Sequence, residues 1–456
     1  MRLSLILIAA LAGLPAAQAQ GAENVELVGV YDERGDYADV WGYTAPDGRE
    51  YGLVALRGVT APSPGLVIVD VTDDAPVEVG FVPTWDDPAI PGAETYDSKD
   101  VKVYGHYAYL VNEVGPLQII DLADPAAPQQ VGLLYNTVNA ADNAGWHNVL
   151  VADDHLWLTG GRSPGGLVVY SLADPTAPRL VGQYQPYYYH DFEIRDGVGF
   201  GPAIYGQGID VLDVSDPANV QPIATFNYPG SGAHNTCTTE DRSHVYVGDE
   251  IGSAGNWTRV FDLSDLEDVE FVGDIVVDAE AVVHNCYVRG DRLYIAHYSE
   301  GLQVFDISAP AAPVRVGFYD TFLGSGYGYQ GAWSVYPYFA SGKLLVSDRT
   351  YGLHVLRVSE PVSDAAAPGD AALALRAAPN PSSGATELSF ALGAPAAVRL
   401  AVYDALGREV AVLVEGPLGA GAHAARLEAR GLPAGVYLAR LTAGARTATQ
   451  TLTRTR

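Results

Sequence analysis

Four dipeptides in the middle of the chain each join a histidine to an amide or acid side chain. They are His147-Asn148, His190-Asp191, His234-Asn235 and His284-Asn285. Neutral imidazoles flanked by carboxylates are a common ligand set for divalent transition metals, and they can also hold an anionic small ligand. These residue types therefore indicate a metal or ligand site, provided that the fold brings the four histidines together.

A short hydrophobic phrase with a regular spacing indicates which elements would position these residues. It occurs seven times, as GLVIVD (65–70), PLQIID (116–121), GLVVYS (166–171), GIDVLD (208–213), WTRVFD (257–262), GLQVFD (301–306) and GLHVLR (352–357). Repeats of roughly 40 to 50 residues that hold several short strands are typical of propeller blades. The sequence therefore predicts an all-β protein whose main part, residues 24–360, is a seven-bladed β-propeller.

The outermost strand of each predicted blade has a pattern of its own, such as VRVGFY at residues 314–319. The seventh repeat lacks this strand, because residue 357 runs directly into VSEPVSDAAAPGD. The missing pattern stands near the N-terminus as ELVGVY, residues 26–31. We therefore expect the N-terminal strand to complete the seventh blade and close the ring, which removes exposed sheet edges.

The innermost strand of a blade lines the central channel, and the histidine pairs stand at the start of that strand. They should therefore surround one mouth of the channel, together with residues at the end of the antiparallel second strand. The predicted metal ligands are His147, His190, His234 and His284. The predicted ligand-binding residues are Asp100, Glu113, Asn148, Asp191, Asn235, Asp249, Glu250, Asn285, His297 and Glu300.

A purely structural role for the same residues is left open. Each histidine could donate from its ring to the backbone of a neighbouring blade, while the following Asn or Asp caps the preceding loop. A feature that recurs in most blades often belongs to the blade itself. The sequence also lacks the His-Glu-x-x-His motif of metalloproteases, and Ser163 and Ser253 have no local signature of an activated nucleophile.

The chain has two cysteines, Cys237 and Cys286, which follow His234 and His284 at distances of three and two residues. Because side chains alternate along a strand, this difference of one residue predicts that the two thiols point in opposite directions. We therefore expect two buried free thiols rather than a disulfide.

The N-terminal residues and the net charge bear on the compartment. Residues 1–19 combine Arg2, an apolar run that ends at Leu14 and small residues up to Ala19, which predicts a cleaved secretory signal peptide. No later segment offers the about 18 apolar residues that a transmembrane helix needs. The net charge is -29, which disfavours nucleic acid as a partner.

A second β-rich module, residues 377–456, follows a predicted linker at residues 361–376, and we expect it to form a small immunoglobulin-like β-sandwich. It contains the motifs APNPSSG (378–384), VYDALGREV (402–410) and LPAGVYLARL (432–441) in this order. With these motifs the module resembles the C-terminal sorting domain of type IX (Por) secretion substrates. The resemblance implies recognition by the type IX machinery, export from a Gram-negative cell, and either attachment to surface lipopolysaccharide or release.

Residues from about 37 to 358 resemble the choice-of-anchor B family, whose repeat is called LVIVD. The resemblance is carried by AHNTCTTEDRSHVYVGDE (233–250), VVHNCYVRGDRLYIAHYSEGLQVFDIS (282–308) and GAWSVYPYFASGKLLVSDRTYGLHVLR (331–357). It implies a propeller at the cell surface and implies no particular activity.

These features together predict an extracellular or cell-surface β-propeller that acts as a binding or scaffolding module for a glycan, a peptide or a small molecule. The alternative is a metal-dependent hydrolase with its site at the histidine-ringed mouth, and a structural surface-layer role is a third hypothesis. The one cofactor that the residues suggest is a divalent metal.

Overall fold

The computed structural model describes residues 21–58, 64–85, 97–138, 145–161, 165–253, 255–324 and 328–359, followed by 375–378, 380, 382, 384–392, 396–404, 408–418, 421–427, 432–433, 435–443 and 446–455. The predicted signal peptide and residues 361–374 of the predicted linker lie outside the described residues. The chain divides into two compact units, Met1–Pro361 and Val362–Arg456. The described residues form strands and no helix, which confirms the all-β prediction. None of them belongs to a helix that could cross a membrane.

The described residues of the first unit form seven antiparallel sheets, which we number in chain order. Sheet 1 contains β3 (Tyr37–Thr44), β4 (Glu50–Leu56), β5 (Gly65–Asp70) and β6 (Val77–Pro83). Sheet 2 contains β7 (Ser98–Tyr104), β8 (Tyr107–Asn112), β9 (Leu117–Asp121) and β10 (Gln129–Leu134). Sheet 3 contains β11 (Asn148–Ala152), β12 (His155–Thr159), β13 (Leu167–Ser171) and β14 (Arg179–Tyr184).

Sheet 4 contains β15 (Glu193–Arg195), β16 (Val198–Ala203), β17 (Gly208–Asp213) and β18 (Gln221–Phe226). Sheet 5 contains β19 (Ala233–Thr238), β20 (His244–Asp249), β21 (Thr258–Asp262) and β22 (Glu270–Ile275). Sheet 6 contains β23 (Cys286–Arg289), β24 (Arg292–Ala296), β25 (Leu302–Asp306) and β26 (Val314–Tyr319), with the short β1 (Ala22–Glu23) at its outer edge. Sheet 7 contains β27 (Ala332–Tyr336), β28 (Lys343–Asp348) and β29 (Gly352–Val358).

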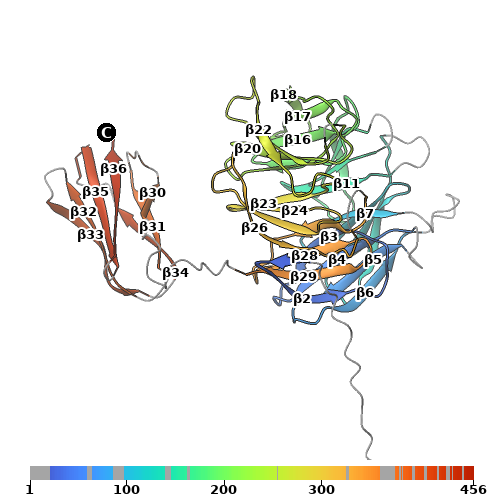
Figure 1. Ribbon diagram of the computed structural model, residues 1–456, viewed down its shortest axis with the longest axis horizontal. Helices are drawn as coiled ribbons and strands as arrows, with labels where there is room; N and C mark the ends of the chain where they lie inside the picture. Colours follow the sequence, from blue (N-terminus) through green and yellow to red (C-terminus); the bar gives the residue numbers. More distant parts are fainter. Residues whose placement is uncertain are drawn as a thin grey trace, which may run out of the picture. The chain divides into compact units, whose positions relative to one another are not determined.

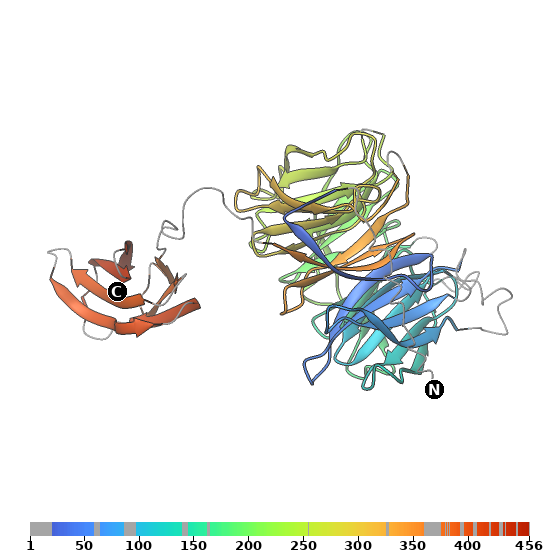
Figure 2. The same cartoon turned by 60° about the horizontal axis from the view of Figure 1, so that its bottom comes forward.

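The fourth strand of sheet 7 is β2 (Val25–Tyr31), which corresponds to the strand expected at residues 26–31. It pairs antiparallel with β29, from Val25 opposite Val358 to Tyr31 opposite Leu353. Figure 1 shows the blue strand β2 beside the orange strand β29. Figure 2 shows the blue and orange sheets adjacent to each other, and β27 and β28 both contact β3. The first and last parts of the unit therefore join.

The repeated hydrophobic phrase forms the third strand of each sheet. In β5 all six residues are buried, whereas the outer strand β14 is exposed or half-buried along its whole length. A strand that is covered on both faces needs a continuous apolar run, and a strand at the rim does not. The burial pattern therefore explains why the phrase, and not the outer strand, carries the strongest repeat signal.

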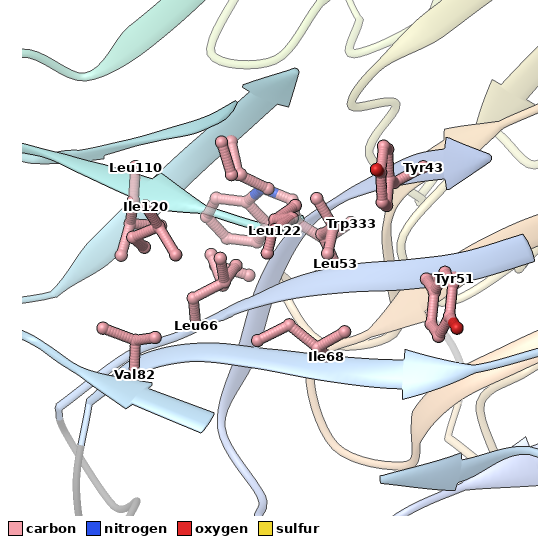
Figure 3. Close-up of a cluster of buried hydrophobic side chains, with 14 of the residues drawn as sticks. Tyr43, Tyr51, Leu53, Leu66, Ile68, Val82, Leu110, Ile120, Leu122 and Trp333 are labelled. Carbon is pink, nitrogen blue, oxygen red and sulfur yellow. The ribbon is translucent and has the colours of Figure 1, made fainter. Parts of the chain in front are cut away.

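A separate cluster of buried apolar side chains fills the space between each sheet and the next, including the space between sheets 7 and 1. Figure 3 shows the cluster between sheets 1 and 2, where Leu53, Leu66 and Ile68 face Leu110 and Ile120. Each of these aliphatic side chains contributes roughly 1.5 to 3 kcal/mol when it is fully buried. Packing between neighbouring sheets therefore holds a propeller arrangement together.

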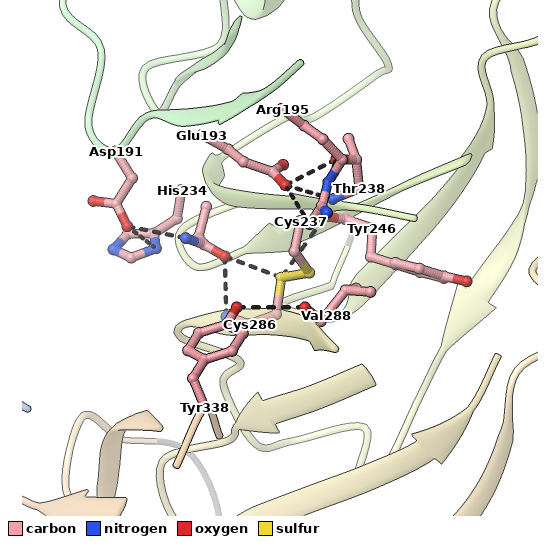
Figure 4. The surroundings of a disulfide bond; sticks show 11 residues. Asp191, Glu193, Arg195, His234, Cys237, Thr238, Tyr246, Cys286, Val288 and Tyr338 are labelled. Atoms are coloured by element: carbon pink, nitrogen blue, oxygen red, sulfur yellow. Dashed lines mark hydrogen bonds and ion pairs between the residues drawn. A yellow bond between two sulfur atoms is a disulfide. The ribbon is translucent and has the colours of Figure 1, made fainter. Parts of the chain in front are cut away.

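The prediction of two free thiols is wrong, because Cys237 and Cys286 form a disulfide with Cα atoms 6.0 Å apart. The pairing register of β19 with β20 shifts between Ala233 and Asn235, so that one extra residue is accommodated at His234. The offset of one residue between the two cysteines is kept and places them on opposite faces of their own sheets, but neighbouring sheets pack face to face, so these two faces meet. Figure 4 shows the resulting bond between sheets 5 and 6.

The second unit contains two sheets among its described residues. One has the order β30 (Leu375–Ala378), β31 (Thr386–Leu392), β34 (Gly421–Leu427), and the other has the order β33 (Glu409–Leu418), β32 (Ala396–Asp404), β35 (Gly435–Ala443), β36 (Arg446–Arg454). Leu388 and Phe390 of the first sheet share a buried cluster with Leu400, Val402 and Leu441 of the second. The unit is therefore a small β-sandwich.

Candidate functional site

The four predicted histidines stand at corresponding places in sheets 3 to 6. His147, His190 and His284 precede the innermost strands, and their backbone N–H groups donate to Thr159, Pro202 and Ala296 at 3.0, 3.1 and 3.0 Å. His234 is the bulge residue of the innermost strand β19. Bulges often redirect a side chain near a functional site. In all four sheets the local backbone thus places the histidine at the same end of the channel.

The four imidazole rings form a continuous row, which we call the imidazole row (His147, His190, His234 and His284). The ring centroids are 4.1 Å apart for His147 and His190, 4.0 Å for His190 and His234, and 4.4 Å for His234 and His284. Trp333 extends the row at 4.5 Å from His284. Residues separated by up to 137 positions in the sequence are therefore neighbours, as the repeat predicts.

Three carboxylates from different sheets lie along the imidazole row. Nδ1 of His147 donates to Glu113 Oε1 at 2.9 Å, and Nδ1 of His190 donates to Asp191 Oδ1 at 2.9 Å. Glu250 lies between the other two rings, with its Oε2 3.7 Å from His234 Nε2 and its Oε1 3.9 Å from His284 Nε2. The hydroxyl of Tyr298 donates to Glu250 Oε1 at 2.8 Å.

The imidazole of His234 differs from those of its neighbours in the row, because it has no hydrogen bond to any of the described residues. Its residue is 1 % exposed, and neither ring nitrogen has a hydrogen-bond partner among the described residues. Asp191 Oδ2 lies 4.0 Å from Nδ1, which is too far for a hydrogen bond. A buried polar group without a partner costs about 1 to 3 kcal/mol, so this ring is the least satisfied member of the row.

Burial and neighbouring charges shift the pKa values of the four histidines in different directions. Burial lowers the pKa of His147 and His284, and it lowers the pKa of His234 well below the usual range. For His190 burial acts in the same direction, but the hydrogen bond to Asp191 outweighs it and raises the pKa. Burial alone would raise the pKa of Glu113, yet the hydrogen bond from His147 and the charge of Lys99 lower it to about 2.

The structural alternative for these residues holds in part. Nδ1 of His284 donates to the backbone carbonyl of Trp333 in the next sheet, as that alternative predicts. Asn235 accepts from the backbone N–H of Cys286 at 3.0 Å, and Asp100 accepts from that of Val149 at 2.9 Å. These two residues therefore link adjacent innermost strands. His147 and His190 pair with carboxylates instead.

Several predicted ligand-binding residues belong to other local networks. Asp249 is fully buried and accepts from Tyr228 at 2.9 Å, with Arg259 Nε 3.5 Å away. His297 is 1 % exposed, and burial lowers its pKa to about 4. Glu300 is half-buried, and its backbone N–H donates to the carbonyl of His297 in a turn. Among the described residues, no side-chain hydrogen bond or ion pair joins these three residues to the imidazole row, whereas Glu113, Asp191 and Glu250 contact it directly.

Asn148 and Asn285 each bury a side-chain oxygen that has no hydrogen-bond partner among the described residues. Asn148 lines a cavity of about 140 Å³ further along the innermost strands, together with Lys102, Asn235 and the disulfide. Asn235 also donates to Asp191 Oδ2 at 3.2 Å, and this bond connects the cavity wall to the imidazole row. A cavity therefore lies beside the imidazole row, along the innermost strands.

Two aromatic residues outside the predicted set of site residues also contribute. Tyr298 contacts His284, with ring centroids 4.9 Å apart, and its hydroxyl donates to Glu250. Tyr188 lies 6.2 Å from His190 and 5.4 Å from Tyr205, which is 66 % exposed. Tyr298 directly follows His297 at the end of a second strand, so the rule that selected Glu300 applied to it equally.

Comparison with protein families identifies two regions of the chain. Residues 377–453 match the model of a secretion system C-terminal sorting domain. Residues 97–137 and 283–321 match the LVIVD repeat. A search of curated proteins gives no match.

Comparison with solved structures gives propeller proteins at low identity. PorZ, an essential bacterial surface component of the type-IX secretion system of Porphyromonas gingivalis, has 12 % identity and a TM-score of 0.47, and the match covers 90 % of this chain and 58 % of PorZ. A chain of the mitotic checkpoint complex has 11 % identity and a TM-score of 0.52, covering 79 % and 100 %. The RRP9 WD40 repeats have 9 % identity and a TM-score of 0.51, covering 73 % and 97 %.

The last two likenesses support the propeller fold alone. The sorting-domain match has a wider meaning, because it points to type IX secretion and hence to a surface or extracellular location. The chain thus contains LVIVD repeats and a C-terminal region that matches a secretion-system sorting domain.

Proposed function

We propose that this protein is an exported binding module of the choice-of-anchor B type. A signal peptide at residues 1–19 takes the chain across the inner membrane, and residues 377–456 engage the type IX machinery. The propeller then reaches the cell surface or the medium, where the mouth that carries the imidazole row binds the ligand.

The observation that carries this proposal is the convergence of polar side chains from several sheets on one mouth. Four imidazoles and three carboxylates lie in contact, and they come from sheets 2 to 6. A few convergent polar groups in a concave site are the usual features of a ligand site. None of the comparisons supports the metal-dependent hydrolase alternative, so the proposal includes no catalytic step.

The aromatic pair beside the row favours a ligand with a flat face. Tyr205 is 66 % exposed and lies against Tyr188, which in turn contacts His190. An exposed aromatic ring next to polar groups suits a sugar ring or an aromatic peptide side chain. The charge of -29 argues against nucleic acid.

Glycan and peptide arrays would test the proposal, with the full mature protein and two variants. Tyr205→Ser should weaken binding of a captured glycan or peptide at least about tenfold, because it removes a central aromatic contact. Phe271→Ser is the control, since Phe271 is 50 % exposed on the outer strand β22. Equal binding by all three proteins would show that the ligand does not use this mouth.

A further inference from the structure

We infer that His190, His234 and Glu250 bind one divalent transition-metal ion. This inference rests on the proposed function, because it places the metal at the same mouth of the propeller. It adds which kind of ligand that mouth binds. One ligand atom from each of the three residues lies within 4.8 Å of the other two.

The three ligand atoms need only small movements to coordinate a metal. His234 Nε2 and Glu250 Oε2 are 3.7 Å apart. Ligand atoms at about 2.0 to 2.2 Å from a tetrahedral zinc ion are about 3.3 to 3.6 Å from each other. Rotations of the side chains that shift these atoms by about 1 Å or less would therefore complete the set.

The groups behind the ligands already hold them in the orientation that a metal site requires. Metal-binding histidines almost always donate the second ring N–H to a carboxylate or carbonyl. Nδ1 of His190 donates to Asp191 at 2.9 Å, which leaves Nε2 available. Tyr298 donates to Glu250 Oε1 at 2.8 Å, which leaves Oε2 available.

His234 provides an independent observation. It is 1 % exposed, and both ring nitrogens lack a hydrogen-bond partner among the described residues. The other three members of the row each use Nδ1 in a hydrogen bond. A metal ion bound at Nε2 would give this nitrogen the partner that none of the described residues provides.

The donor set selects the class of metal. Two imidazole nitrogens and one carboxylate oxygen suit Zn²⁺ and its neighbours in the first transition series, whereas Ca²⁺ and Mg²⁺ prefer oxygen ligands only. An anion is disfavoured because Glu113, Asp191 and Glu250 all lie along the row. Three protein ligands leave a fourth position for a donor atom of the bound partner.

A second group, His147, His190 and Asp191, also has ligand atoms within 4.8 Å of one another. It shares His190 with the first group, and its Asp191 already accepts from both His190 and Asn235. A ligand atom cannot serve both groups at once, so the structure favours a single ion at the first group.

Metal uptake by the full mature chain tests the inference directly. The protein is stripped by dialysis against a chelator, and Zn²⁺ binding is measured by titration calorimetry, with Co²⁺ absorption reporting the geometry. We expect one Zn²⁺ per chain and no competition from millimolar Ca²⁺ or Mg²⁺. His234→Asn and Glu250→Gln should each weaken Zn²⁺ binding by more than about 100-fold, and Tyr298→Phe by about tenfold, because removal of an outer group typically costs 10- to 100-fold.

Matched controls separate loss of a ligand from loss of a buried side chain. His297→Asn removes another histidine that is 1 % exposed and has two unpartnered ring nitrogens, and Glu300→Gln removes a carboxylate near the end of a second strand. Both controls should bind Zn²⁺ as the wild type does. A wild type that takes up no Zn²⁺ or Co²⁺ at about 100 μM, or uptake that His234→Asn and Glu250→Gln leave unchanged, would overturn the inference.

The metal-binding experiment and the array experiment can fail independently of each other. A metal-free wild type that still binds a glycan or peptide through Tyr205 would refute the metal site and leave the binding module intact. Zn²⁺ bound by the three residues, without any array ligand, would support the metal site and refute the aromatic platform.

Discussion

Lys102 lies in the centre of the propeller between two buried aspartates. Its Nζ donates to Asp39 at 3.0 Å and to Asp100, and it stands 4.6 Å from the ring of Trp41. The three charged side chains are 5 % exposed or less. Burial opposes the charge of the lysine, but the two carboxylates outweigh it and raise the pKa of Lys102 well above its usual range.

Lys102→Met should lower the free energy of unfolding by about 3 to 5 kcal/mol, because it leaves buried carboxylates without a partner. Urea unfolding would measure the change. Arg357→Met is the control: Arg357 pairs with Glu26 at 3.1 Å but is 41 % exposed, so its loss should cost less than about 1 kcal/mol. Similar losses in the two variants would contradict the argument.

Asp348 should make the stability depend on pH. Burial raises its pKa from 3.8 to about 6, although Thr321, Thr350 and Tyr351 all donate to it. The folded protein thus holds this proton more tightly than the unfolded chain, so the contribution of Asp348 is fully present below about pH 4 and is lost as pH rises to about 6.

Asp348→Asn should remove this dependence, because the amide resembles the protonated acid at every pH. The variant should match the wild type near pH 4 and exceed its free energy of unfolding by up to about 3 kcal/mol at pH 8, at about 1.4 kcal/mol per pKa unit. Urea unfolding of both proteins across this range would measure the difference. A constant difference at all pH values would show that the carboxyl is not the titrating group.

At the residue scale, the sequence could predict those site residues that follow from the repeat. The four histidines share one position per sheet, and strand pairing adds Glu113 and Glu250. Tyr298 and the isolation of His234 depend on which rotamer each side chain adopts. The same strand-pairing rule selected Asp249 as a site residue, but Asp249 pairs with Tyr228 and Arg259 instead. The repeat does not predict these contacts.

Among the elements, the outer strands contain a glycine that repeats at one position. A Cβ added at Gly182 of β14 would collide with the backbone carbonyl of Pro217 in the next sheet. The corresponding Gly273 of β22 has nothing within 4 Å. The repeated glycine is thus needed in some sheets because the turn of the next sheet approaches closely.

Gly182→Ala should therefore lower the free energy of unfolding by about 1 to 3 kcal/mol through overpacking. Gly273→Ala should change it by less than about 1 kcal/mol or raise it slightly, since alanine restricts the unfolded chain. Thermal and urea unfolding would compare the two variants. If both substitutions had the same effect, contact with the next sheet would not be the reason for the glycine.

Deletion of residues 24–31 should destabilise the whole propeller, because it exposes the edge of β29 and uncovers the clusters that contain Val25 and Tyr31. Deletion of residues 21–23 is the control, since it removes only β1 from the outer edge of sheet 6. Differential scanning calorimetry should show a decrease of many degrees for the first variant and a small change for the second. A first variant that melts like the mature protein would contradict a closing role for β2.

The strands themselves could be predicted because the hydrophobic phrase, the turns and the outer-strand pattern repeat together. The disulfide could not. The prediction placed the two thiols on opposite faces of their sheets, but it did not consider that opposite faces of neighbouring sheets meet. Alternation along a strand gives the face of its own sheet to which a residue belongs, and whether two residues meet depends on how the sheets pack.

The whole molecule consists of two units with separate apolar cores. A chain that ends at Pro361 should therefore keep a folded propeller, as its clusters receive nothing from the sorting domain. In a cell with type IX secretion, we expect this variant to stay in the periplasm while the full chain reaches the surface or medium. Fractionation with immunoblotting would measure this, and wild-type surface levels of the short chain would contradict the role of residues 377–456.

Closure by the N-terminal strand also sets the order in which the protein can mature. Glu26 and Arg357 pair across 331 residues, so β2, near the start of the chain, can pair only after β29 has been synthesised. Contacts between such distant parts form slowly. We therefore expect a chain interrupted before β29 to keep an open sheet edge that proteases can attack. Ring closure would then distinguish complete propellers from incomplete ones.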